Sequence, residues 1–102
     1  MKYIIAAPGT SAEDVILDFS SQSLADSNRG IQLFGSYWHF YGLTIKGAGD
    51  NSMYVSGKNN ITENCIFVGN RDSGLQIARE KPSLSNMSDW PSNNLILNCT
   101  SL

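Results

Sequence analysis

The sequence has few charged residues and no cluster of basic ones. Seven lysines and arginines stand against nine acidic residues among 102, which gives a formal net charge of −2. A protein surface that neutralises nucleic-acid phosphates needs lysine and arginine gathered on one face. We therefore expect no nucleic-acid partner.

Long apolar runs are also lacking. The longest run near the start, Tyr3 to Ala7, is too short for the core of a signal peptide and far too short to span a bilayer. These residues therefore predict neither a signal peptide nor a membrane segment.

Histidine and cysteine are scarce. With His39 as the only histidine, a zinc site or a serine triad has little basis, and we expect His39 to be a packing residue within a strand. Cys65 and Cys99 occupy the same place in a repeat where another copy has Leu43, which favours buried thiols, although a disulfide between adjacent coils is geometrically possible.

No segment has a helical period, but the chain repeats every 22 residues. Ile31–Leu33 matches Met53–Val55, which in turn matches Leu75–Ile77. A second set begins at Leu43, recurs at Cys65 and returns at Cys99 after twelve extra residues. Repeats of this length indicate a solenoid, in which each unit buries its apolar face only by stacking on its neighbours.

The repeat segments are short, rich in β-branched and aromatic residues, and separated by Gly, Asn, Asp and Ser, which is typical of strands and turns. Ile31, Met53 and Leu75 would form one inward column, and Leu33, Val55 and Ile77 the next. The expected strands are Val15–Phe19, Gly30–Phe34, Trp38–Ile45, Met53–Val55, Ile61–Val68, Leu75–Ala78 and Leu95–Thr100.

A turn recurs in each copy, just before the column that holds Leu43. Gly42, Asn64 and Asn98 occupy it, and these residue types tolerate left-handed backbone conformation. Short strands joined by such turns and stacked about 4.8 Å apart predict an all-β parallel β-helix of three to four coils.

The period breaks at residues 80–92, which we interpret as a loop inserted into one coil; such insertions often lie on the binding face. Residues 1–11 carry no polar capping element, and the sequence stops within a repeat at Leu102. We expect residues 1–102 to form a partial β-helix domain that lacks later coils and a C-terminal cap.

Several strings resemble the early coils of pectate lyases of polysaccharide lyase family 9. The strings are VILDFSSQ at 15–22, RGIQLFGSYWHFYGLTIKGAGDNSMYV at 29–55, NRDSGLQIAR at 70–79 and WPSNNLILNCTS at 90–101. The resemblance extends from about Asp14 onward. It is most specific in the aromatic string and in the last string, since general β-helix patterning requires neither.

The resemblance implies a right-handed parallel β-helix that cleaves polygalacturonate by β-elimination, with calcium and a lysine base. The cation stabilises charge beside the uronate carboxylate while the base removes a proton. In the family, most acidic calcium ligands and the lysine follow the string that ends this chain. The resemblance thus implies a fragment, inactive alone, of a secreted or periplasmic enzyme that is a monomer at full length.

By register, the family's preceding calcium-binding carboxylate corresponds to Asp72, with Asp89 in the inserted loop as the second choice. Asp50 has the same register one coil earlier, and there we expect a structural role. Arg71 and Arg79 flank the strand after Asp72 and are candidates to bind substrate carboxylates. The lysine base matches none of Lys2, Lys46, Lys58 and Lys81, and the aromatic residues Tyr37, Trp38, Tyr41 and Tyr54 are expected to be structural.

Two other functions stay open. The same repeats suit a non-catalytic β-helix that binds carbohydrate or serves adhesion. They also suit a lyase that acts on another polyuronate, such as alginate or chondroitin.

Overall fold

The structure, a computed structural model, describes residues 1–102 except 26, 82 and 84. It consists of short strands joined by turns, with two single-turn 3-10 helices. In chain order these are β1 (Lys2–Ile5), η1 (Ala12–Asp14), β2 (Ile16–Asp18), β3 (Ile31–Leu33), β4 (Trp38–Tyr41), β5 (Thr44–Lys46), β6 (Met53–Val55), β7 (Ile61–Glu63), β8 (Ile66–Val68), β9 (Leu75–Ile77), η2 (Met87–Asp89), β10 (Leu95–Leu97) and β11 (Thr100–Ser101).

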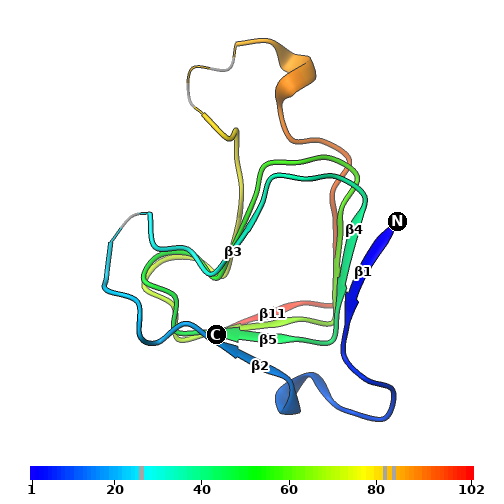
Figure 1. Cartoon of the computed structure of the whole chain (residues 1–102), viewed down its shortest axis with the longest axis vertical. Coiled ribbons are helices and arrows are strands. Elements are labelled where there is room, and N and C mark those ends of the chain that lie inside the picture. Colours follow the sequence, from blue (N-terminus) through cyan, green and yellow to red (C-terminus); the bar gives the residue numbers. More distant parts are fainter. Residues whose placement is uncertain (26, 82, 84) are drawn as a thin grey trace.

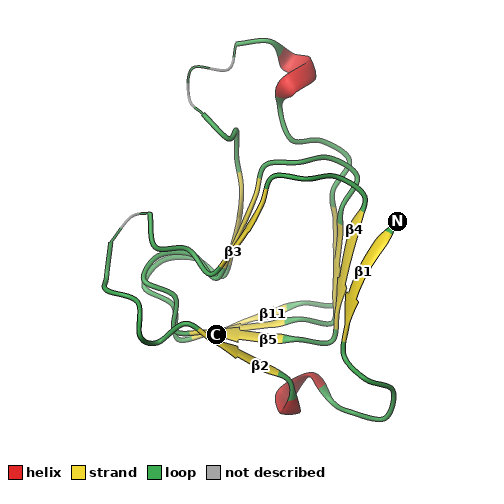
Figure 2. Cartoon of the chain, viewed as in Figure 1, coloured by secondary structure: helices red, strands yellow, loops and turns green. Residues whose placement is uncertain are grey.

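The strands form three parallel sheets that make the sides of a coil (Figures 1 and 2). One sheet has the order β1-β4-β7-β10, the second β2-β5-β8-β11, and the third β3-β6-β9. The chain passes through each sheet once per turn and therefore completes three coils and part of a fourth. Within the described ranges 1–25, 27–81, 83 and 85–102, no helix is long and apolar enough to cross a bilayer.

The 22-residue register is confirmed strand by strand. Ile31 pairs with Met53 and Met53 with Leu75, and Leu33, Val55 and Ile77 follow in the same way. Along the second sheet, Thr44 pairs with Ile66 and Ile66 with Thr100, across the twelve extra residues. Equivalent positions of successive repeats therefore lie over one another.

The recurring turn is confirmed, and it divides three of the expected strands. Gly42, Asn64 and Asn98 have φ angles of 74°, 52° and 52°, in the left-handed region that glycine and asparagine tolerate. Because the backbone bends sharply there, the expected strands 38–45, 61–68 and 95–100 are each two strands that belong to different sheets.

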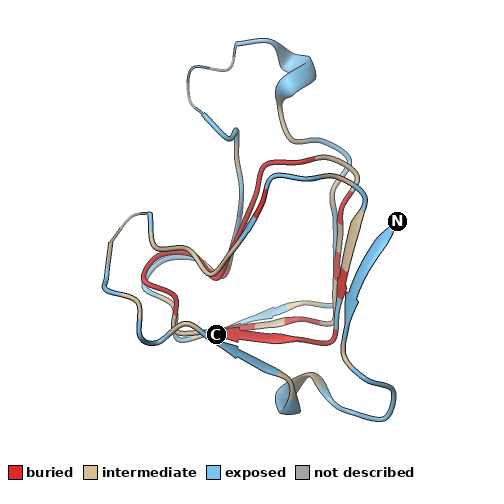
Figure 3. Cartoon of the chain, in the orientation of Figure 1, coloured by how far each residue is buried: buried red, intermediate tan, exposed pale blue. Residues whose placement is uncertain are grey.

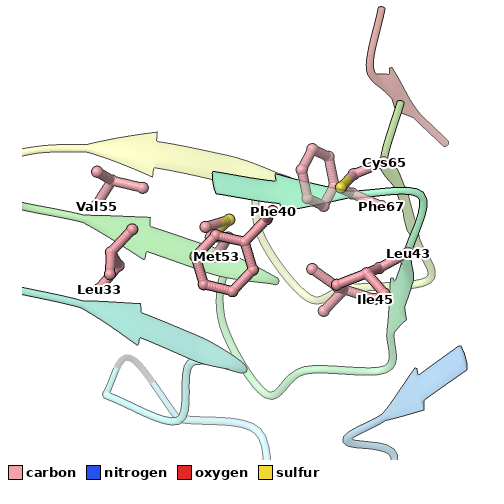
Figure 4. Packing of buried hydrophobic residues seen from close by; sticks show 8 residues of the cluster. All are labelled: Leu33, Phe40, Leu43, Ile45, Met53, Val55, Cys65 and Phe67. Carbon is pink, nitrogen blue, oxygen red and sulfur yellow. The ribbon is translucent and has the colours of Figure 1, made fainter. Parts of the chain in front are cut away.

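The core lies inside the coil and is densest in the middle of the stack (Figure 3). Side chains from all three sheets meet there, and Figure 4 shows them pointing toward one another. The buried cluster consists of Leu33, Phe40, Leu43, Ile45, Met53, Val55, Cys65 and Phe67. The first and last coils are more exposed because each has a neighbour on one side only.

The two cysteines are free thiols. Cys65 is fully buried in the core and Cys99 is half-buried in the coil above it. Burial in apolar surroundings raises the pKa of the Cys65 thiol. The interpretation as packing residues is confirmed, and no disulfide joins these coils.

A side-chain ladder holds the corner that follows the third sheet. Buried Asn60 accepts from the Trp38 backbone N–H (2.9 Å) and donates to the Gly35 carbonyl (3.0 Å). Asn94, at the equivalent place beyond the insertion, accepts from the Asn60 N–H and donates to the Gly57 carbonyl, both at 3.0 Å. An asparagine in each of two successive coils thus satisfies backbone groups of the coil below it.

The pattern predicted the loop between β9 and β10 but neither the strand β1 nor the short helix η2 within that loop. Residues 2–5 form β1, which pairs with β4 from Lys2 opposite Trp38 to Ile5 opposite Tyr41. Between β9 and β10 the chain leaves the stack and carries η2, drawn in orange in Figure 1. Of the insertion expected at 80–92, Pro82 and Leu84 lie outside the described residues.

Replacing Gly57 by alanine should destabilise the stack. A Cβ atom at Gly57 would lie 2.7 Å from the carbonyl carbon of Gly35 and closer still to its oxygen, and backbone cannot move aside without breaking the ladder. We expect G57A to lower the free energy of unfolding by about 3 kcal/mol. Urea unfolding followed by circular dichroism measures it.

Gly69 supplies the control for this variant. It has φ 65° with open space around the missing Cβ, so Gly69→Asn, which suits that conformation, should change stability little. Equal losses in both variants would contradict the account, since the cause would then not be the close approach of coils.

Candidate functional site

The turn before β9 is fixed to the coil below it by its backbone and by two asparagine side chains, of which one is buried and one half-buried. Asn70 accepts from the Ala48 N–H (2.9 Å), and the Arg71 N–H donates to the Ala48 carbonyl (3.2 Å). The buried Asn51 side chain accepts from the N–H (3.1 Å) and the hydroxyl (2.6 Å) of Ser73. The turn is therefore rigid even though it lies at the surface.

Arg71 and Asp72 are exposed on this turn. The Asp72 N–H donates to the Asp50 carbonyl at 3.2 Å, which places Asp72 directly over Asp50, as the register predicted. The backbone bonds hold the turn, and the Asp72 side chain on it is exposed to solvent.

Arg79 lies at the other end of β9, where the inserted loop begins. The Tyr54 hydroxyl donates to the Arg79 carbonyl at 2.7 Å, and the Arg79 guanidinium lies over the Trp90 ring at 5.3 Å. Trp90 follows η2 at the return of the loop, so this cation–π contact closes the base of the loop. The structure thus separates Arg71 from Arg79 by the length of β9.

Asp89 is exposed in η2, on the part of the loop that projects from the stack (Figure 1). The loop is tied back to the stack by the Lys58 ammonium, which donates to the Ser88 carbonyl. Within the loop, the Asn86 side chain caps η2 by accepting from the Ser88 N–H at 3.1 Å. The turn that carries Asp72 precedes β9, whereas the loop that carries Asp89 follows it. The two candidate carboxylates therefore lie at separate sites.

An arginine that pairs with a carboxylate and lies over an aromatic ring beside β6 was missed in the sequence. Arg29 lies with its guanidinium 4.0 Å from the centre of the Tyr54 ring and its Nε 3.5 Å from the Asp50 carboxylate. As a result Tyr54, although it points away from the core, is only 6% exposed. Arg29 and Asp50 are separated by one residue less than the repeat length. Opposite charges at nearly this spacing were the signal in the sequence that could have predicted their contact.

Asp50 therefore has the structural role that was expected. Its carboxylate is buried and paired with Arg29, so it cannot turn toward a ligand without leaving that guanidinium unpaired. Asp72, one coil above, has no such burial. The same register position thus holds a buried ion pair in one coil and an exposed carboxylate in the next.

A calcium ion needs six to eight oxygen ligands, usually several carboxylates among them. In the part of the chain that the structure describes, no three His, Cys, Asp or Glu side chains come together as a metal-binding group. Asp72 is a single exposed carboxylate. The described residues alone do not complete a calcium site.

The aromatic residues divide into two groups. Trp38 packs against the core and Tyr54 lies under Arg29, as expected of structural residues, whereas Tyr37 and Tyr41 are exposed. His39 is half-buried in β4, and its Nε2 lies 3.0 Å from a Glu63 carboxylate oxygen in the neighbouring coil. The histidine has the packing role expected of it.

The fold is that of a parallel β-helix with an exposed polar turn and an inserted loop at the two ends of one strand. The family model described as Pel9A-like, right handed beta helix region, matches residues 1–102. The chain belongs to this family, and the right-handed parallel β-helix is confirmed.

Curated relatives carry the name pectate lyase L. The protein of Paenibacillus polymyxa (strain SC2) is 52% identical over 87 residues, which cover 85% of this chain and 19% of the relative. That of Thermoclostridium stercorarium is 37% identical over 102 residues, covering 98% of this chain and 8% of the relative. The chain therefore spans about a fifth or less of these relatives. No solved structure matches it significantly.

Substituting the two stacked aspartates should have unequal effects. Asp50→Asn removes the charge that pairs with Arg29 in a buried place, and we expect it to lower the free energy of unfolding by about 1 to 2 kcal/mol. Asp72→Asn changes an exposed side chain and should stay within about 0.5 kcal/mol of the parent. Thermal unfolding compares them, and a larger loss for D72N would contradict the assignment of roles.

Proposed function

We propose that the chain forms early coils of a calcium-dependent pectate lyase that cleaves polygalacturonate by β-elimination. The family match over residues 1–102, together with relatives named pectate lyase L, carries this proposal. In this proposal the parent protein acts outside the cytoplasm, secreted or periplasmic, because its polymeric substrate does not enter cells. It is also proposed to be a monomer at full length.

In this proposal Asp72 contributes one calcium ligand. Its exposure on a turn held by backbone bonds supports the role, since a ligand on a rigid element loses little conformational freedom when the ion binds. Asp89 is the second candidate. When bound, calcium supplies positive charge beside the substrate carboxylate. The other ligands and the lysine base are proposed to lie in later coils of the parent protein.

Arg71 and Arg79 are proposed to bind uronate carboxylates at either end of β9. A guanidinium matches a carboxylate in geometry and charge, and the Trp90 ring beside Arg79 adds an aromatic surface for a sugar ring. Because the two arginines lie at opposite ends of a strand, they would contact different sugar units of one polymer rather than clamp a single unit.

The chain by itself is expected to bind polygalacturonate without cleaving it. Retardation in a native gel that contains polygalacturonate measures binding, and the ultraviolet absorbance of unsaturated uronates measures cleavage. Arg71→Ala and Arg79→Ala should each weaken binding about fivefold, which corresponds to roughly 1 kcal/mol for an exposed ion pair. Added salt should weaken it further.

Lys46→Ala serves as the control. Lys46 lies on the second sheet, 3.8 Å from Asp18, and its removal changes the net charge equally without touching β9. Release of unsaturated products by the chain would overturn the proposed inactivity. Equal retardation by neutral polymers would instead favour a non-catalytic carbohydrate-binding module, and preference for alginate or chondroitin would favour a lyase of another polyuronate.

A further inference from the structure

A hollow of about 340 Å³ lies at the corner between the first and second sheets, away from the turn and loop at β9. Residues 6–12, between β1 and η1, line one side. Tyr41, Gly42 and Asn64 line the other side, at the recurring left-handed turn. Figure 1 shows the segment between β1 and β2 swinging out from the stack at this corner. Its size falls within the range of small-ligand sites.

The rim of the hollow is fixed before any ligand arrives. The Thr10 N–H donates to the Ala7 carbonyl (3.2 Å), with Pro8 second in the turn and Gly9 third at φ 86°, as a type II turn requires. The Ala6 N–H donates to the Tyr41 carbonyl (3.0 Å) at one end of the segment. At the other end, the Thr44 hydroxyl donates to the Ala12 carbonyl (2.6 Å).

An aromatic strip leads out of the hollow along the outer face of the first sheet. Tyr41, 39% exposed, meets His39 with ring centres 6.4 Å apart, and His39 meets Tyr3, 62% exposed, at 5.6 Å. Exposed aromatic rings beside a hollow offer flat apolar surface to the C–H faces of sugar rings. A folded core does not explain such exposure, because these side chains point away from it.

Polar groups of the lining are of the kind that recognises hydroxyls. The Tyr41 hydroxyl accepts from the Asn64 amide (3.0 Å) and keeps its own proton to donate. The Thr10 hydroxyl donates to Ala7 (2.6 Å) and keeps its lone pairs to accept. Neutral donors and acceptors that remain available next to an aromatic face favour a polyhydroxylated ligand.

The charges around the hollow exclude an acidic ligand. None of the residues that line it carries a charge at neutral pH. Glu13 and Asp14 follow directly in η1, and Glu63 lies beside His39. Negative surroundings repel a uronate carboxylate, whereas they leave a neutral sugar unaffected.

We propose that this hollow binds a neutral sugar unit of a glycan, stacked on the Tyr41 ring and hydrogen bonded by the Tyr41 and Thr10 hydroxyls. The site is separate from the arginines at β9, so the protein holds a neutral glycan chain at one corner and an acidic one at another. This division suits a substrate in which neutral and acidic chains occur together.

The test is a titration of the chain, labelled with ¹⁵N, with galactotetraose and separately with tetragalacturonate. The two probes share the ring configuration and differ in charge at carbon 6. Galactotetraose should shift the amide signals of residues 7–11 and of Gly42, and tetragalacturonate should leave them unchanged. Tyr41→Ala and the hollow-filling Ala7→Leu should each weaken galactotetraose binding about tenfold.

Tyr37→Asn is the matched control. Tyr37 is 57% exposed but does not line the hollow, and its φ of 64° suits asparagine. Binding that survives in Y37N and in R71A, but is lost in folded A7L, supports the site. The proposal is overturned if galactotetraose shifts no amide there, if A7L binds as the parent does, or if tetragalacturonate binds the hollow more tightly.

Discussion

Hydrogen bonding between equivalent residues of successive coils is the constraint on which the rest of the structure depends. Each strand has two to four residues, which is too short to be stable alone, so every sheet exists only because the chain returns to the same register. That return requires close approach at Gly35 and Gly57 and an asparagine at positions 60 and 94 to satisfy the backbone of the corner. The insertion after β9 is tolerated because the ladder resumes in register at Asn94.

The same constraint divides structural from functional positions. Stacking places Asp72 over Asp50, yet Arg29 reaches only the lower carboxylate, where it also covers Tyr54. The upper carboxylate is left on a rigid and exposed turn. Arg79 and the inserted loop meet through Trp90 at the far end of β9. A solenoid thus varies the surface of one coil without altering the core that the coils share.

The sequence predicted the features that depend on the repeat alone. The inward columns, the left-handed turns at Gly42, Asn64 and Asn98, the packing role of the cysteines and the structural role of Asp50 follow from residue type and register. Contacts between different register positions were not predictable in this way. Arg29 lies over Tyr54 although the two residues occupy different register positions, and β1 is recognised as a strand only when β4 is present beside it. Arg71 and Arg79 are separated because β9 lies between them as an extended strand. The roles of Asp72 and of both arginines stay predictions.

Amide hydrogen exchange in the native protein tests the stacking account most directly. Strands β5 and β6 have partner coils on both sides and hold Ile45, Met53 and Val55, which are almost completely buried. Their amides should exchange most slowly, with free energies of opening near that of global unfolding, while β1 and β11 at the ends of their sheets should exchange faster. Protection that is uniform along the chain, or greatest in β1 and β11, would contradict a stack in which each coil is stabilised by its neighbours.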